Sequence, residues 1–196
     1  MRALSTTDLI LEPQAAAHAD EMFAVLSDPA IYEFENAPPP SADWLRARFS
    51  RQETRRSPDG NEQWLNWVIR LNTSQQSAGY VQATITGQHA LIAYELSSQY
   101  WGKGIARAAV SIVLQELARH YGIRQYFAIL KQRNFRSKKL LDRLGFVQAS
   151  TGQLSMLNPD KDENAMALSV QASGPALPVP HHACGHSSKG AGRPKW

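Results

Sequence analysis

Hydrophobic and polar positions alternate in two ways along residues 7–170, and each way predicts one kind of element. Short apolar runs typical of strands lie at 7–13, 64–71, 79–86, 90–96, 125–130, 146–150 and 165–170. Apolar residues at helical spacing recur in 15–26, 42–54, 103–120 and a short stretch after Asn134. Only turn-like segments separate the three strands between 64 and 96, which is typical of an antiparallel meander. The pattern therefore predicts a mixed α/β domain.

Polar residues at helix starts support two of these boundaries. Ser41 follows three prolines and precedes the helix at 42–54, where its hydroxyl suits the N-cap position. Asn134 is an equally good N-cap for the short helix after it, which Gly145 ends. The helix at 103–120 has the clearest apolar stripe of the chain. Its members are Ile105, Ala106, Ala109, Val110, Val113, Leu114 and Leu117.

The composition changes after residue 171. Residues 172–196 are rich in Pro, Gly, Ser and His and have almost no bulky apolar side chains, so we expect a domain at 1–171 followed by a disordered tail. His181, His182, Cys184 and His186 lie close together in this tail, and such side chains bind Zn²⁺ or Cu²⁺. Because the segment is expected to be flexible, we interpret such binding as adventitious and expect no functional metal.

Length and composition restrict the class of protein. A chain of 196 residues with 43% hydrophobic residues suits one globular domain that needs no disulfide to fold. The single cysteine fits a reducing compartment. No apolar run has membrane-spanning length, and the first residues lack the apolar core of a signal peptide. We therefore expect a cytoplasmic protein without a membrane partner.

Positive charge is concentrated in one segment. The formal net charge is +4, yet residues 1–98 contain 12 acidic and 7 basic side chains. Residues 99–143 contain 10 basic and 2 acidic side chains. Because the chain is not uniformly basic, we expect no nucleic-acid partner. A solvated helix face is the ordinary explanation of such a block, unless it coincides with a phosphate-binding turn.

A turn with two glycines opens that basic segment. Gly102 and Gly104 lie between a strand and the helix at 103–120, where a glycine backbone can approach an anion and helix N–H groups are unpaired. This arrangement indicates a pyrophosphate site, with a plain glycine turn as the alternative. A Walker loop is excluded because G-x-x-x-x-G-K-[ST] does not occur. A dinucleotide fingerprint is excluded because Arg107 stands where a third glycine or alanine is needed.

This turn resembles a motif of a known family. The run Gln99-x-x-Gly102-x-Gly104-Ile105-Ala106 resembles the Q/R-x-x-G-x-G/A acetyl-CoA signature of the GNAT N-acetyltransferases. The resemblance covers about residues 5–170, and the order of the predicted elements agrees with it. It implies the GNAT acyl-CoA N-acyltransferase fold, in which helices flank a mostly antiparallel central sheet.

A second motif is similar to one branch of that family. The segment from Asn134 through Ser137 to Leu144-Gly145-Phe146 is similar to N-x-x-S-x-x-x-x-x-x-L-G-F of the RimJ/RimL branch, which acetylates ribosomal-protein N-termini. Both motifs occur with the strand and helix neighbours that the family has. The resemblance therefore implies an acetyl-CoA-dependent N-acetyltransferase.

The resemblance also assigns residues to acetyl-CoA as co-substrate. Backbone amides of the turn would hold its pyrophosphate, and the end of the strand at 90–96 would bond its pantetheine arm. Asn134 would bond the pantetheine or acetyl end, although its role as an N-cap explains it locally. Some basic residues from Lys131 to Arg143 would face the phosphates. The implied contacts are Leu96, Ser97, Gln99, Gly102, Lys103, Gly104, Ile105, Ala106 and Asn134.

Glu95 is the candidate general base. It ends the strand beside the implied cofactor site, and family members often use a carboxylate on this strand to deprotonate or orient the amine. By alternation Glu95 points away from Tyr94 and Leu96. The alternative for Glu95 is therefore a carboxylate that simply faces solvent.

Ser137 is the candidate that protonates the departing thiolate. Many relatives carry a tyrosine for this purpose five residues before the final Phe146 of the motif, where this chain has Leu141. Ser137 matches the serine of the RimJ/RimL motif and is available to donate or relay the proton. The alternative is an ordinary serine on a helix surface.

The acceptor is less defined than the acetyl donor. An α-amine with a pKa of about 7.7–8.0 is already roughly 10–20% neutral at pH 7, so it needs less help from a base than a lysine amine. We therefore favour a protein N-terminal α-amine, with a small-molecule amine next. The acidic first half favours a cationic acceptor, bound by residues 30–41, the helix at 42–54 and the loop after the fourth strand region. Candidate residues are Glu33, Glu35, Asp43 and Trp44.

One alternative from another class stays open. A non-catalytic acyl-CoA-binding or regulatory module on the same scaffold would also lack a tyrosine at position 141. The sequence gives no signal of the oligomeric state.

Overall fold

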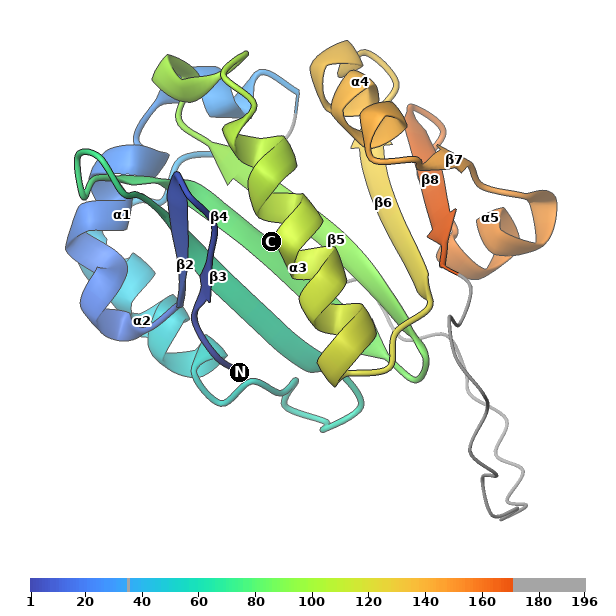
Figure 1. Cartoon of the computed structure of the whole chain (residues 1–196), viewed down its shortest axis with the longest axis horizontal. Helices are drawn as coiled ribbons and strands as arrows, with labels where there is room; N and C mark the ends of the chain where they lie inside the picture. The colour runs from blue at the N-terminus through green and yellow to red at the C-terminus, as the bar shows by residue number, and fades with distance from the viewer. Residues whose placement is uncertain (35, 171–196) are drawn as a thin grey trace.

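A computed structural model describes residues 1–34 and 36–170 (Figure 1). The described strands form one sheet in the order β1-β2-β3-β4-β5-β6-β8-β7, and only the pair β5–β6 is parallel. This confirms the predicted mixed α/β architecture with a mostly antiparallel sheet flanked by helices. The strands are β1 (Leu4–Ser5), β2 (Leu9–Pro13), β3 (Gln63–Leu71), β4 (Ser77–Thr86), β5 (His89–Leu96), β6 (Gln125–Lys131), β7 (Val147–Gln148) and β8 (Glu163–Ser169). The α-helices are α1 (Ala19–Leu26), α2 (Ala42–Gln52), α3 (Ile105–His120), α4 (Phe135–Arg143) and α5 (Thr151–Leu157), and short 3₁₀ turns are η1 (Ala16–His18), η2 (Pro29–Tyr32) and η3 (Ser98–Tyr100).

Helices cover both faces of the sheet, because successive residues of a strand point to opposite sides. On one face, α3 packs in a cluster with Val81 and Ala83 of β4. On the other face, α1 and α2 pack with Val68 of β3 and Tyr80 of β4. Figure 1 shows α3 lying across the central strands, with α1 and α2 beyond them. Side chains of β4 and β5 therefore reach two separate layers.

The strands β5 and β6 separate toward their carboxyl ends. Only His89–Leu91 of β5 pair with residues 125–127 of β6, although β5 continues to Leu96 and β6 to Lys131. The whole length of β6 pairs with β8 on its other side. The end of β5 is therefore left without a partner on the β6 side. The candidate site is built at this separation.

Both predicted N-caps are confirmed. The Ser41 hydroxyl accepts a hydrogen bond from Trp44 N at 3.1 Å and begins α2. The Asn134 side chain accepts one from Ser137 N at 3.0 Å and begins α4. The first turns of both helices are therefore held by local side chains, as their sequences predict.

The prediction is wrong at the end of the domain. It omits α5, which begins with a capping box formed by Ser150 and Gln153. The strand expected at 146–150 is short, because only Val147 and Gln148 pair with β8. The predicted tail at 172–196 lies outside the described residues. Within the described part of the chain, no helix is both long enough and apolar enough to cross a membrane.

Candidate active site

A groove opens where β5 and β6 separate. Its volume is about 950 Å³. Its walls come from the end of β5, the turn between η3 and α3, the first turn of α3 and one side of α4. This volume is at the upper end of the range for small-molecule sites, so the groove has room for a ligand as large as a nucleotide cofactor.

The turn before α3 lines this groove with unpaired backbone donors. Gly102 and Gly104 have φ of 74° and 80°, which residues with side chains rarely adopt, and nothing lies within 4 Å of where a Cβ would be. The amides from Gly102 to Arg107 donate no hydrogen bond to any other described residue. These donors lie at the positive end of a helix of 16 residues. The turn therefore fits a pyrophosphate.

Basic side chains surround the groove. The Arg136 guanidinium carbon lies 3.6 Å from the ring centre of Trp101, a cation–π contact that holds this charge at the groove. Lys131 pairs instead with Asp162 at 3.0 Å. Only some of the positive charges of the basic segment therefore lie at the groove. The groove-lining cations are Lys103, Arg107, Arg136, Lys139 and Arg143.

Most of the predicted cofactor contacts line the groove, but Ser97 and Gln99 do not. Ser97 is buried with its hydroxyl 3.4 Å from Asp28 Oδ2, and the exposed Gln99 amide reaches Ser97 Oγ at 3.4 Å. Asn134 uses its side-chain oxygen as the N-cap of α4, which leaves its Nδ2 for a ligand. The predicted contacts that line the groove are Leu96, Gly102, Lys103, Gly104, Ile105, Ala106 and Asn134.

Ser137 and Tyr94 form a hydrogen-bonded pair in the groove wall. Their hydroxyl oxygens, one on α4 and one on β5, are 2.6 Å apart. Burial raises the pKa of Tyr94 to about 12, so this phenol is protonated at neutral pH. Leu141 is buried in the core. A phenol therefore reaches the groove from β5 rather than from position 141.

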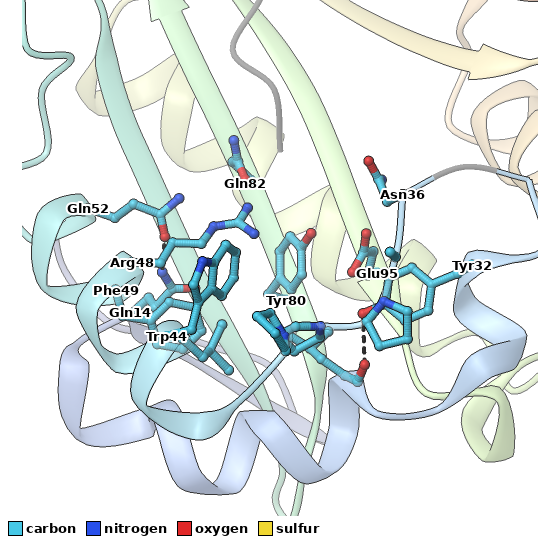
Figure 2. A pocket seen from close by; sticks show the side chains of 16 residues that line it. Gln14, Tyr32, Asn36, Trp44, Arg48, Phe49, Gln52, Tyr80, Gln82 and Glu95 are labelled. Atoms are coloured by element: carbon cyan, nitrogen blue, oxygen red, sulfur yellow. Dashed lines mark hydrogen bonds between the residues drawn. The ribbon is translucent and has the colours of Figure 1, made fainter.

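Glu95 lies between the groove and a second cavity. The second cavity has a volume of about 270 Å³ and is formed by the sheet, α2 and the segment 36–40 (Figure 2). Glu95 is the only described residue that lines both. Tyr80, opposite Glu95 on β4, hydrogen-bonds to it. Burial and the negative charge of Glu95 raise the pKa of Tyr80 well above its usual value, so Tyr80 remains a donor. The Glu95 carboxylate is therefore half-buried where the two cavities adjoin.

The second cavity is lined mainly by the segment that the sequence assigns to acceptor selection. Of the four predicted acceptor residues, Trp44 lines it. Asp43 pairs with Arg46, and Glu33 lies 3.9 Å from Arg136. Glu35 lies outside the described residues. The remaining polar and aromatic lining is Gln14, Tyr32, Asn36, Arg48, Phe49, Gln52, Tyr80 and Gln82.

The sequence prediction missed several of these side chains. The spacing along a strand or a helix could have identified some of them. Tyr94 alternates with Leu96 on one face of β5, so a groove contact at Leu96 implies one at Tyr94. Arg48 follows Trp44 by one helical turn, so Trp44 in the cavity implies Arg48 there. Gln82 has no such signal, because the sequence does not distinguish the floor of a cavity from the core.

Among the residues that the structure describes, no group of three or more side chains could hold a metal ion. The predicted tail cluster of His181, His182, Cys184 and His186 lies outside them.

The turn, groove and second cavity can be compared with known proteins. A family model described as Acetyltransferase (GNAT) domain matches residues 8–147, which include both motifs. The chain belongs to the GNAT acetyltransferases. It is therefore an acyltransferase, as the resemblance implies. No curated protein sequence matches this GNAT chain.

Solved structures similar to this GNAT protein share its fold at low identity. RimL, a ribosomal L7/L12 α-N-protein acetyltransferase in complex with coenzyme A, is 17% identical with a TM-score of 0.72, covering 86% of this chain and 98% of that one. A ribosomal-protein-S5-alanine acetyltransferase from Vibrio fischeri is 17% identical with a TM-score of 0.68, covering 88% and 99%. The microcin C7 self-immunity acetyltransferase MccE, in complex with acetyl-CoA and AMP, is 18% identical with a TM-score of 0.67, covering 84% and 94%.

Proposed function

We propose that this GNAT protein transfers the acetyl group of acetyl-CoA to a primary amine by direct attack of the amine on the thioester. The groove holds acetyl-CoA and the second cavity holds the amine. The observation that carries this proposal is the position of Glu95, which lines both cavities. Two ligands react only where their reacting atoms meet, and the Glu95 carboxylate lies where the two cavities adjoin.

The amides of the turn and the surrounding cations bind the phosphates, and the separation of β5 from β6 admits the pantetheine arm. Acetyl-CoA, when bound, supplies an activated acetyl thioester. Leu96 and Asn134 lie along the groove between the phosphate turn and the reacting end. Because the groove collects unpaired donors and positive charge, it favours a polyanionic ligand.

Glu95 acts as the base of the proposed reaction. It accepts a proton from the ammonium form of the acceptor, either directly or through water, and leaves the neutral amine that attacks the carbonyl carbon. The hydrogen bond from Tyr80 orients the carboxylate. An α-amine needs only modest help of this kind, because its pKa is about 7.7–8.0.

Ser137 acts on the other side of the reacting carbonyl. When the carbon–sulfur bond breaks, its hydroxyl donates to the departing sulfur and stabilises the charge that develops there. Tyr94 holds that hydroxyl at 2.6 Å and replaces the proton that Ser137 gives up, and water then returns a proton to Tyr94. Tyr94 can supply that proton because its raised pKa of about 12 keeps it protonated at neutral pH. The nitrogen loses its own extra proton to water as the amide forms, which balances the proton that the sulfur takes up.

The acceptor we favour carries an α-amine, first of a protein N-terminus and second of a small molecule. The similar structures of RimL and MccE support both directions, since RimL acts on a ribosomal protein and MccE confers immunity to a microcin. The second cavity, with a volume of about 270 Å³, supports the small molecule or a single terminal residue. The lone cysteine supports a cytoplasmic location.

Calorimetric titration of acetyl-CoA tests the groove. We expect micromolar binding by the wild type and a loss of at least tenfold in Gly102→Glu, because the added carboxylate repels the phosphates. Gly60→Glu is the matched control, since Gly60 has the same φ of 74° and equally open surroundings, and is not among the groove-lining residues. Absence of binding by the wild type would contradict the proposal.

Release of coenzyme A in the presence of amines tests catalysis separately. We expect turnover with at least one α-amine. Binding of acetyl-CoA without turnover on any amine would favour the non-catalytic acyl-CoA-binding module instead.

A further inference from the structure

Three buried glutamines line the second cavity. Gln14 follows β2, Gln52 ends α2 and Gln82 lies within β4, with exposed fractions of 2%, 7% and 2%. Gln14 Nε2 donates to Gln52 Oε1 at 2.7 Å. Gln82 Nε2 has no hydrogen-bond partner among the described residues. Because an unpaired buried amide is costly, its position in a cavity wall indicates a polar ligand there.

Arg48 brings a positive charge to the same cavity. Its guanidinium carbon lies 5.5 Å from the ring centre of Trp44, and Figure 2 shows it extending past Trp44 toward Tyr80. Arg48 is half-buried and forms no ion pair within residues 1–34 and 36–170. A half-buried guanidinium without a carboxylate partner is suited to bind an anion, because its N–H groups match two carboxylate oxygens.

The second cavity is therefore polarised between Glu95 and Arg48. Both charges act on the buried phenol of Tyr80, which lies on the cavity wall. Burial raises the pKa of Tyr80 most, Glu95 raises it further and Arg48 lowers it. A ligand with one cationic and one anionic group complements such a cavity, whereas a polyamine would place a second positive charge near Arg48.

The size of the cavity limits the ligand as well. Its volume of about 270 Å³ lies just below the range of about 300–1,000 Å³ that is usual for small-molecule pockets. That is room for one amino-acid unit but not for an oligosaccharide.

We infer that the acceptor carries a carboxylate in addition to its amine, with the carboxylate bound by Arg48 and the Gln82 amide while the amine lies at Glu95. This inference rests on the proposed function, because it takes Glu95 as the place where the amine reacts. It replaces the cationic acceptor expected from the acidic first half with a zwitterionic one. Two sources supply this chemistry: a free amino acid through its α-carboxylate, and a peptide whose first residue is acidic.

Two pairs of amines and two variants test this inference in an assay of coenzyme A release. The first pair is L-alanine and L-alaninamide. The second pair is two tripeptide amides that differ only in their first residue, glutamate or glutamine. Arg48→Gln removes the charge of the cavity, and Arg51→Gln removes a charge from the exposed surface of the same helix. Because the amines of a pair differ in pKa, the readout is the change in their kcat/KM ratio between enzymes.

We expect Arg48→Gln to lower the ratio of carboxylate to neutral amine at least tenfold in one pair, while Arg51→Gln leaves it unchanged. A change in the first pair identifies the free amino acid, and a change in the second identifies the acidic peptide. An unchanged ratio in both pairs overturns the inference while leaving the proposed function intact. Failure of all four amines with intact acetyl-CoA binding overturns it too. If the wild type does not bind acetyl-CoA, the proposed function fails and the inference falls with it.

Discussion

At the scale of single residues, one carboxylate connects the two cavities of this molecule. Glu95 lines the groove and the second cavity, and Tyr80 holds it by a hydrogen bond. We expect Glu95→Gln to lower kcat at least tenfold and to leave the acetyl-CoA Kd within about twofold, because the amide cannot accept the amine proton. Steady-state kinetics and calorimetry measure the two quantities. Asp8→Asn, at an exposed position that lines neither cavity, is the control. Turnover near the wild-type value in Glu95→Gln would exclude Glu95 as the base.

The pair of Ser137 and Tyr94 predicts a graded effect. Ser137→Ala removes the hydroxyl that we propose as the donor to the departing sulfur, and we expect kcat to fall about tenfold to a hundredfold. Tyr94→Phe removes only the hydroxyl that contacts Ser137, and we expect a smaller decrease in kcat with unchanged acetyl-CoA affinity. Equal or reversed losses would contradict a relay from Tyr94 through Ser137.

The raised pKa of Tyr94 adds a pH dependence. The phenol donates only while it is protonated, and its pKa of about 12 keeps it so through pH 10. We therefore expect wild type and Tyr94→Phe to have parallel kcat profiles between pH 7 and 10. A decline of the wild type in this range that is missing from the variant would mean that the phenol titrates lower.

The sequence can predict a site residue when its neighbours along the chain carry the signal. It cannot do so when the site forms only by contact between distant segments. The glycine turn is a local feature, so Gly102 and Gly104 were identifiable from their order between a strand and a helix. Glu95 was identifiable because it ends a strand. Arg48 and Gln82 meet only because α2 folds over β4, and no local pattern records that contact.

At the scale of elements, β4 and β5 approach each other very closely at Gly79. A Cβ there would lie 2.0 Å from the carbonyl oxygen of Glu95. We expect Gly79→Ala to lower the free energy of unfolding by about 2 kcal/mol or more and to reduce kcat, because β4 and β5 must separate beside Glu95. Urea denaturation measures the first effect. Gly152→Ala in α5, where nothing lies within 4 Å, should instead stabilise the protein by up to about 1 kcal/mol.

Asp28 connects the start of η2 to the segment that follows β5. Its carboxylate accepts hydrogen bonds from Ser98 N at 2.7 Å and Ala30 N at 3.0 Å. The hydrogen bonds from Ser98 are the main cause that lowers the pKa of Asp28 below its usual value of 3.8. A lowered folded-state pKa means that the stabilisation is complete at neutral pH and is lost as the pH falls through that folded pKa. We expect Asp28→Asn to lower Tm at pH 7, and we expect this difference from the wild type to shrink as the pH falls below 3.8. A difference in Tm that is the same above and below this pH would contradict this role.

The elements that the sequence predicts are strands and helices with a clear hydrophobic periodicity, or helices with a recognisable N-cap residue. α3 and the meander β3–β5 carry strong patterns, and Ser41 and Asn134 mark the starts of α2 and α4. α5 has only 7 residues, and its capping box is its main local signal. The separation of β5 from β6 depends on how two distant segments pair, so no pattern within either strand reveals it.

At the scale of the whole molecule, β8 is the last described strand along the chain, and it ends at Ser169. The family model also ends well before that point, at residue 147. We expect deletion of residues 172–196 to leave Tm and kcat/KM unchanged, because the elements of the site lie before it. Thermal denaturation and the coenzyme A release assay check this. A large loss of either quantity would give the tail a role, beginning with its histidines and Cys184.

The single carboxylate shared by the groove and the second cavity has a consequence for inhibitor design. One molecule can occupy both spaces only if it passes Glu95, so the sulfur of coenzyme A joined by an acetyl-length bridge to the nitrogen of an amino acid would span them. Such a bisubstrate compound would gain binding free energy from both sites while losing translational and rotational entropy only once. Its coenzyme A half would lie in the groove beside the glycine turn. Its amino-acid half would meet Arg48 and the buried glutamines, so selectivity for this enzyme would come from that end.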